Sequence, residues 1–221
     1  MKNTIAIRPK EVTQIPEPPI ARFLFSDTRM AWFWLIVRLY VGYEWLTAGL
    51  EKLTGRDFTI GSTFGKVVSS PWVFGAHDGA AIKGFVMGAL AQTGGAHPAV
   101  QGWYAAFLQN VVLPNAALFA YMVTFGEVLV GVALILGILT GIAAFFGVFM
   151  NMNYLLAGTV STNPILGFLA LFLILAWRIA GYYGLDRYIL PLLGTPWTGP
   201  LVHKTTSTAA ATPPKDPVAT R

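Results

Sequence analysis

Four charged residues interrupt stretches of sequence that are otherwise apolar: Arg38, Glu44, Glu127 and Arg178. A charged side chain is costly inside a membrane, so a charge within an apolar segment is a candidate for function. A carboxylate can relay protons, and an arginine can donate hydrogen bonds to a carbonyl oxygen. These residue types indicate either chemistry on a polar ligand or an ion pair that only fixes helix packing.

The depth of each charge within its segment predicts its partners. At ~1.5 Å per residue, Glu127 lies near the middle of its segment, with Arg38 and Arg178 slightly toward one end. We expect Glu127 to pair with Arg38 or Arg178. Glu44 and Arg38 occupy different faces of one helix, so we expect each to reach toward other helices.

The functional interpretation of this cluster is a site for the head group of a quinone. A quinone needs hydrogen-bond donors for its carbonyl oxygens and a route for protons. Glu127, Arg38 and Arg178 are the expected catalytic residues. The expected cofactor-binding residues beside them are Glu44, Tyr43 and Trp45.

The composition indicates which elements must position these residues. Charged residues make up 11% of the chain and hydrophobic residues 55%, whereas a soluble domain has roughly 25% charged residues. We therefore predict an all-α integral membrane protein, a four-helix transmembrane bundle with an extracytoplasmic helical cap between helices 1 and 2. The expected spans are about 30–53, 114–140, 141–158 and 164–183.

The remaining segments divide the chain into a membrane domain, residues 30–192, and two tails. Residues 1–29 form a polar N-terminal tail, and residues 193–221 form a flexible C-terminal tail. The outer loop, 54–112, is too polar to span a membrane and contains two predicted short helices, at 80–92 and 98–111.

Lysine and arginine predict the orientation. Both ends of the chain are basic, which accounts for much of the net charge of +5. The positive-inside rule then places both termini in the cytoplasm and the protein in the inner (cytoplasmic) membrane. Because the basic residues have this explanation, we expect lipid rather than nucleic acid as a partner.

Other polar residues define the remaining ligand chemistry. Asn151, in the third span, either bonds to a neighbouring helix or contacts the cofactor. The loop histidines His77 and His97 are too few for a metal site. Since the chain has no cysteine, it contains no iron–sulfur cluster and no covalent haem. Quinone is the expected cofactor, and electron transfer would require another protein subunit.

Three motifs resemble the DoxX/DoxD family of four-helix membrane proteins. They are R-L-Y-V-G followed by G-L-E-K-L (38–53), F-G-E-V-L-V-G-V-A-L-I-L-G-I-L-T-G (125–141) and G-Y-Y-G-L-D-R-Y (181–188). The resemblance is greatest to the DoxD branch, the large subunit of thiosulfate:quinone oxidoreductase, which works with the small subunit DoxA. It implies roles for Arg38 and Glu127, and adds Lys52 and Asp186 to the cofactor-binding candidates.

Two functions therefore remain open. The first is the membrane subunit of a quinone-linked oxidoreductase, with thiosulfate as a candidate electron donor. The alternative is a non-catalytic subunit that anchors a larger respiratory or photosynthetic electron-transfer complex. A transporter is less well supported, because the sequence shows neither an inverted repeat nor a pair of interrupted helices.

Overall fold

The computed structural model describes residues 17–61, 63–75 and 79–193, and within these ranges every regular element is a helix. The predicted all-α class is confirmed for this part of the chain. The elements are α1 (Pro19–Ser26), η1 (Thr28–Met30), α2 (Ala31–Thr54), α3 (Ala80–Leu90), α4 (Gly102–Phe107), η2 (Leu108–Val112), α5 (Ala116–Leu136), α6 (Thr140–Leu156), α7 (Asn163–Leu175), α8 (Trp177–Ala180) and α9 (Asp186–Leu192).

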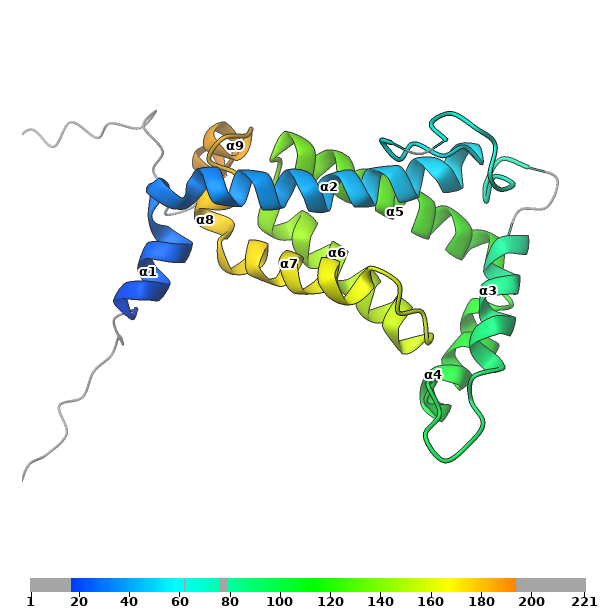
Figure 1. The fold of residues 1–221 in the computed structure, drawn as a ribbon. Coiled ribbons are helices and arrows are strands. Elements are labelled where there is room, and N and C mark those ends of the chain that lie inside the picture. Colours follow the sequence, from blue (N-terminus) through cyan, green and yellow to red (C-terminus); the bar gives the residue numbers. More distant parts are fainter. Residues whose placement is uncertain (1–16, 62, 76–78, 194–221) are drawn as a thin grey trace, which may run out of the picture.

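The four longest helices pack side by side, with α2 against α5 and α7, and α6 against α5 and α7. Helices α3 and α4 lie across one end of this group, whereas α1, α8 and α9 lie at the other end (Figure 1). Both ends of the described chain are therefore at the end opposite α3 and α4. The helices α3 and α4, with η2, form what we call the cap. They coincide with the two helical segments predicted in the loop 54–112, except that α4 begins four residues after the predicted start at 98.

Glycines set the register of α2 against α5. A Cβ atom on Gly49 would lie 2.7 Å from the backbone nitrogen of Val128, and one on Gly131 would lie 2.5 Å from that of Leu46. Because such distances are too short for a side chain, the two backbones approach closely only where glycine is present. The facing pairs show that the helices run antiparallel. Gly131 of α5 thus packs on α2.

The connection between α5 and α6 is a tight turn, as predicted. Gly137 adopts a left-handed conformation at φ +67°, and Leu139 follows at φ +46°. Since residues 137–139 are not helical, α5 ends four residues before the predicted boundary at 140. This turn brings α6 back against α5 with almost no intervening loop.

The fourth predicted span, 164–183, is not one continuous helix. It divides at Ala176 into α7 and the four-residue α8. Trp177 packs directly over Gly141 of α6, where a glycine Cβ would lie 2.8 Å from the Trp177 Cβ. The break therefore seats this tryptophan on α6 and leaves the neighbouring Arg178 at the surface, with 46% of its side chain exposed.

Length and hydropathy single out one helix in the described ranges as able to cross a membrane, namely α5. Helices α3, α6 and α7 are apolar but have fewer than 18 residues. Helix α2 is long enough at 24 residues, but its charged residues and its tyrosine and tryptophan residues lower its mean hydropathy.

The packing of Gly131 on α2 gives a test of the α2–α5 register. We expect Gly131→Ala to lower the midpoint of thermal unfolding by several degrees, because the new methyl group overlaps the α2 backbone and overpacking costs about 1–3 kcal/mol. The control is Gly88→Ala on α3, where a Cβ meets no atom within 4 Å. The test is to measure the midpoint of thermal unfolding of both purified variants, with tryptophan fluorescence as the signal. Equal midpoints would contradict the register.

Candidate functional site

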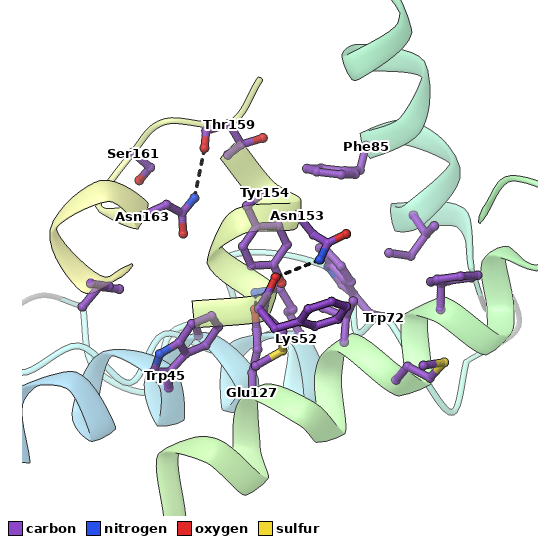
Figure 2. Close-up of a pocket in the computed structure, with 18 of the residues that line it drawn as sticks. Trp45, Lys52, Trp72, Phe85, Glu127, Asn153, Tyr154, Thr159, Ser161 and Asn163 are labelled. Carbon is purple, nitrogen blue, oxygen red and sulfur yellow. Dashed lines mark hydrogen bonds and ion pairs between the residues drawn. The ribbon is translucent and has the colours of Figure 1, made fainter. Parts of the chain in front are cut away.

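A partly buried cluster of three polar side chains joins α2, α5 and α6. The Lys52 ammonium lies 2.7 Å from Glu127 Oε2, and the Tyr154 hydroxyl donates to Glu127 Oε1 at 2.5 Å. Glu127 is only 1% exposed, so its carboxylate depends on these two donors rather than on water. We call Lys52, Glu127 and Tyr154 the polar cluster (Figure 2).

The predicted pairing of Glu127 with Arg38 or Arg178 is wrong. In the α2–α5 register, Arg38 lies against Gly137, which is ten residues from Glu127, or roughly 15 Å along the helix axis. Arg178 lies at the far end of the helices and pairs with Glu17 at 3.4 Å. Lys52, near the C-terminal end of α2, is instead level with Glu127 and takes the place of the expected arginine.

A cavity of about 640 Å³ opens over the polar cluster, between the cap and the α2, α5 and α6 helices. This volume is within the usual range for small-molecule sites, about 300–1,000 Å³. Its walls are predominantly apolar, and α3 and α4 supply Phe85 and Phe107. The cavity therefore offers an apolar space that ends on a partly buried ammonium, a buried carboxylate and a hydroxyl.

Aromatic rings fix the position of the polar cluster. The Tyr154 ring stacks on Trp45, with 6.5 Å between ring centroids, and meets Phe85 edge-on at 6.2 Å. The Lys52 ammonium also lies 5.1 Å from the centre of the Trp72 ring, close enough for a cation–π interaction. Figure 2 shows Phe85 projecting from α3 on the opposite side of the cavity from Trp45.

The cap is attached to α6 through a second tyrosine. The Tyr104 hydroxyl donates to the Asn153 backbone carbonyl at 3.1 Å and to its side-chain oxygen at 3.0 Å. Burial raises the pKa of Tyr104 to about 12, so the hydroxyl keeps its proton and its donor role at neutral pH. Both residues line the cavity, so this contact holds one of its walls.

The predicted cofactor-binding residues separate into two groups. Glu44, Trp45 and Lys52 line the cavity. Tyr43 instead accepts a hydrogen bond from the Ile60 backbone N–H at 2.6 Å, which ties the loop after α2 back to that helix. Asn151 is buried against Gly167 of α7, is not among the lining residues and, within the described ranges, makes no side-chain hydrogen bond.

Arg38 and Asp186 form a separate cluster at the other end of α2. Asp186 accepts hydrogen bonds from the backbone N–H groups of Leu139 and Thr140, at the start of α6. The buried Arg38 donates to the Tyr183 carbonyl at 3.3 Å and lies against Gly137 at the end of α5. These contacts clamp the segment before α9 onto the α5–α6 turn, where Arg38 also complements the helix dipole. Their geometry is that of a packing contact.

Sequence reasoning missed Tyr154 and the aromatic residues of the cap and of the loop after α2 that line the cavity. Tyr154 follows Asn151 and Asn153 in one apolar helix, so a third polar group within four residues was the available signal. Trp72, Phe85 and Phe107 gave no comparable signal, because their contribution depends on how the cap folds over α2 and α6.

The outward side chains define the class of protein. Large apolar residues are exposed along α5, α6 and α7, among them Leu129, Phe145 and Phe168 at 66%, 55% and 61%. Glu127 and Arg38, by contrast, lie inside, each only 1% exposed. An apolar exterior around buried charges is the arrangement of a membrane protein.

The chain belongs to the DoxX family. The DoxX family model matches residues 33–160, which is more than half of the 221 residues and includes α2 to α6. Comparisons with curated proteins and with solved structures find no match. The family match includes every member of the polar cluster, whereas Asp186 lies beyond it.

The coupling between Lys52 and Glu127 can be measured by a double-mutant cycle. We expect Lys52→Met to lower stability by about 3–5 kcal/mol, because it leaves the buried carboxylate without its cation. Adding Glu127→Gln to the Lys52→Met variant should restore much of the lost stability, since the double variant has no buried charge at this site. Thermal unfolding of the two single variants and the double variant gives the coupling. Strictly additive effects would show that the two side chains do not interact.

Proposed function

We propose that this protein is the membrane subunit of a quinone-linked oxidoreductase, with the quinone ring bound in the cavity beneath the cap. One observation carries the proposal: a ligand-sized, predominantly apolar cavity ends on the polar cluster of Lys52, Glu127 and Tyr154. A quinone is a flat apolar ring with carbonyl oxygens, so these walls and donors fit its chemistry. Bound quinone would supply the two-electron, two-proton redox chemistry.

The roles of the residues follow from their contacts. Lys52 carries three donor hydrogens, one of which points to Glu127, so it can also donate to a ligand carbonyl. Tyr154 donates its only proton to Glu127 and can redirect it toward a ligand. Glu127 orients both donors and is positioned to exchange protons with them. Trp45 and Phe85, which flank Tyr154, offer flat surfaces for a ring.

The electron donor would be external to the chain. Without cysteine, the chain holds no thiol or cluster that could pass electrons. We propose that a partner subunit delivers them, with thiosulfate as the ultimate donor, as the resemblance to the DoxD branch implies. This role does not require Arg38 or Arg178 in catalysis, since both lie far from the cavity.

The proposal includes four membrane spans. Helix α6 has 17 residues, the lower limit for crossing a ~30 Å hydrocarbon core, and α7 with α8 covers a similar length. Together with α2 and α5 they would cross the inner membrane four times. The cap would then lie on the extracytoplasmic side and both termini in the cytoplasm.

Binding of a short-chain ubiquinone to the protein in lipid nanodiscs tests this function. We expect saturable quenching of tryptophan fluorescence, because Trp45 and Trp72 line the cavity. Tyr154→Phe should weaken binding roughly three- to tenfold, the equivalent of one hydrogen bond. Tyr40→Phe, an exposed tyrosine on the same helix as Lys52, is the control and should bind as the unaltered protein does.

Turnover gives the second readout. In a complex isolated with its electron-donating partner, Glu127→Gln should lower quinone turnover by about 10²–10⁴-fold while the variant still inserts and folds. Absence of saturable quenching in the unaltered protein would contradict quinone binding and favour the accessory role. Undiminished turnover in Glu127→Gln would remove the proton-transfer role of this residue.

A further inference from the structure

The cavity has an excess of negative charge. Its described lining includes three carboxylates, Glu44, Glu51 and Glu127, and one cationic side chain, Lys52. Lys52 lies 2.7 Å from Glu127 Oε2, so its charge is already balanced by that residue. Glu44 and Glu51 therefore leave the space with two negative charges that no lining cation offsets.

The two extra carboxylates share one face of α2. They are seven residues apart, or two helical turns, and both are half-buried beside Thr47 and Ala48, which also line the cavity. The next cation along the chain, Arg56, donates to the Gly65 carbonyl at 2.8 Å and is not a lining residue. Lys83 of α3 is exposed and likewise lies outside the lining. Any ligand in the cavity thus faces Glu44 and Glu51 without a compensating cation.

We propose that Glu44 and Glu51 act as specificity-determining residues that admit neutral ring ligands to this cavity and exclude anions, including thiosulfate. Charges of like sign repel strongly where apolar walls limit screening by water. A neutral quinone carries no net charge and avoids this repulsion. An anionic electron donor would then be oxidised on a partner subunit, with only electrons passed to the cavity. This inference rests on the proposed quinone site and specifies which ligands enter it.

A matched pair of ligands isolates the effect of charge. We would titrate the full-length protein in nanodiscs with 1,4-naphthoquinone and with 1,4-naphthoquinone-2-sulfonate, which share one ring system and differ by one negative group. Tryptophan quenching reports binding without any need for turnover. The sulfonated ligand should bind at least tenfold more weakly, and thiosulfate should not compete with the neutral ligand beyond a sodium chloride control of equal ionic strength.

Substitutions assign the selectivity to its residues. In Glu44→Gln/Glu51→Gln the difference in affinity between the two ligands should shrink to less than about threefold, chiefly through tighter binding of the sulfonate. The control is Glu17→Gln, the same substitution at the opposite end of the protein, which should keep the full difference.

The outcomes distinguish this inference from the function on which it rests. Equal binding of the two naphthoquinones, or a difference that persists in the double variant, would overturn the charge selection and leave quinone binding intact. Binding of neither ligand would overturn both.

Discussion

A cation beside the buried carboxylate of Glu127 stabilises its charge, and the register of α2 against α5 decides which cation that is. Gly49 and Gly131 let the two backbones approach where larger side chains would overlap. In that register Lys52 is level with Glu127, whereas Arg38 is level with Gly137. A shift of one helical turn would separate the ion pair and leave a charge unpaired in an apolar environment.

This register separates the charged residues into two sites with different contacts. At the capped end, the polar cluster faces a cavity and has donors to spare for a ligand. At the other end, Arg38 and Asp186 bind backbone groups of the α5–α6 turn and of the segment before α9. Charged residues from one set of motifs therefore fall into a cavity-facing group and a packing group.

Much of the helical framework could be predicted from sequence, because apolar runs of 17–24 residues and glycine-marked turns are local signals. Residue type or the family resemblance also made candidates of Glu127, Lys52 and Trp45, which line the cavity. The partner of Glu127 was not, because depth estimates along separate helices carry no information about register. The division of the fourth span depends on the packing of Trp177 over Gly141, and this contact joins residues far apart in the chain.

The cavity itself could not be predicted, because its walls come from elements with no sequence pattern in common. Phe85 lies on α3, Trp72 lies in the loop after α2, and Tyr154 lies on α6. Only the tertiary fold brings them together beside Lys52 and Glu127. The cavity is thus a property of the tertiary structure.

The most direct test of a quinone site beneath the cap is photoaffinity labelling with an azido-quinone in native-like membranes, followed by mass spectrometry of the labelled peptides. The structure predicts labels on cavity-lining residues of α2, α3 and α6, near Lys52, Phe85 and Tyr154, and loss of those labels when excess unmodified quinone competes. Labelling confined to the opposite end, around Arg38 and Asp186, or labelling that excess quinone does not suppress, would contradict it.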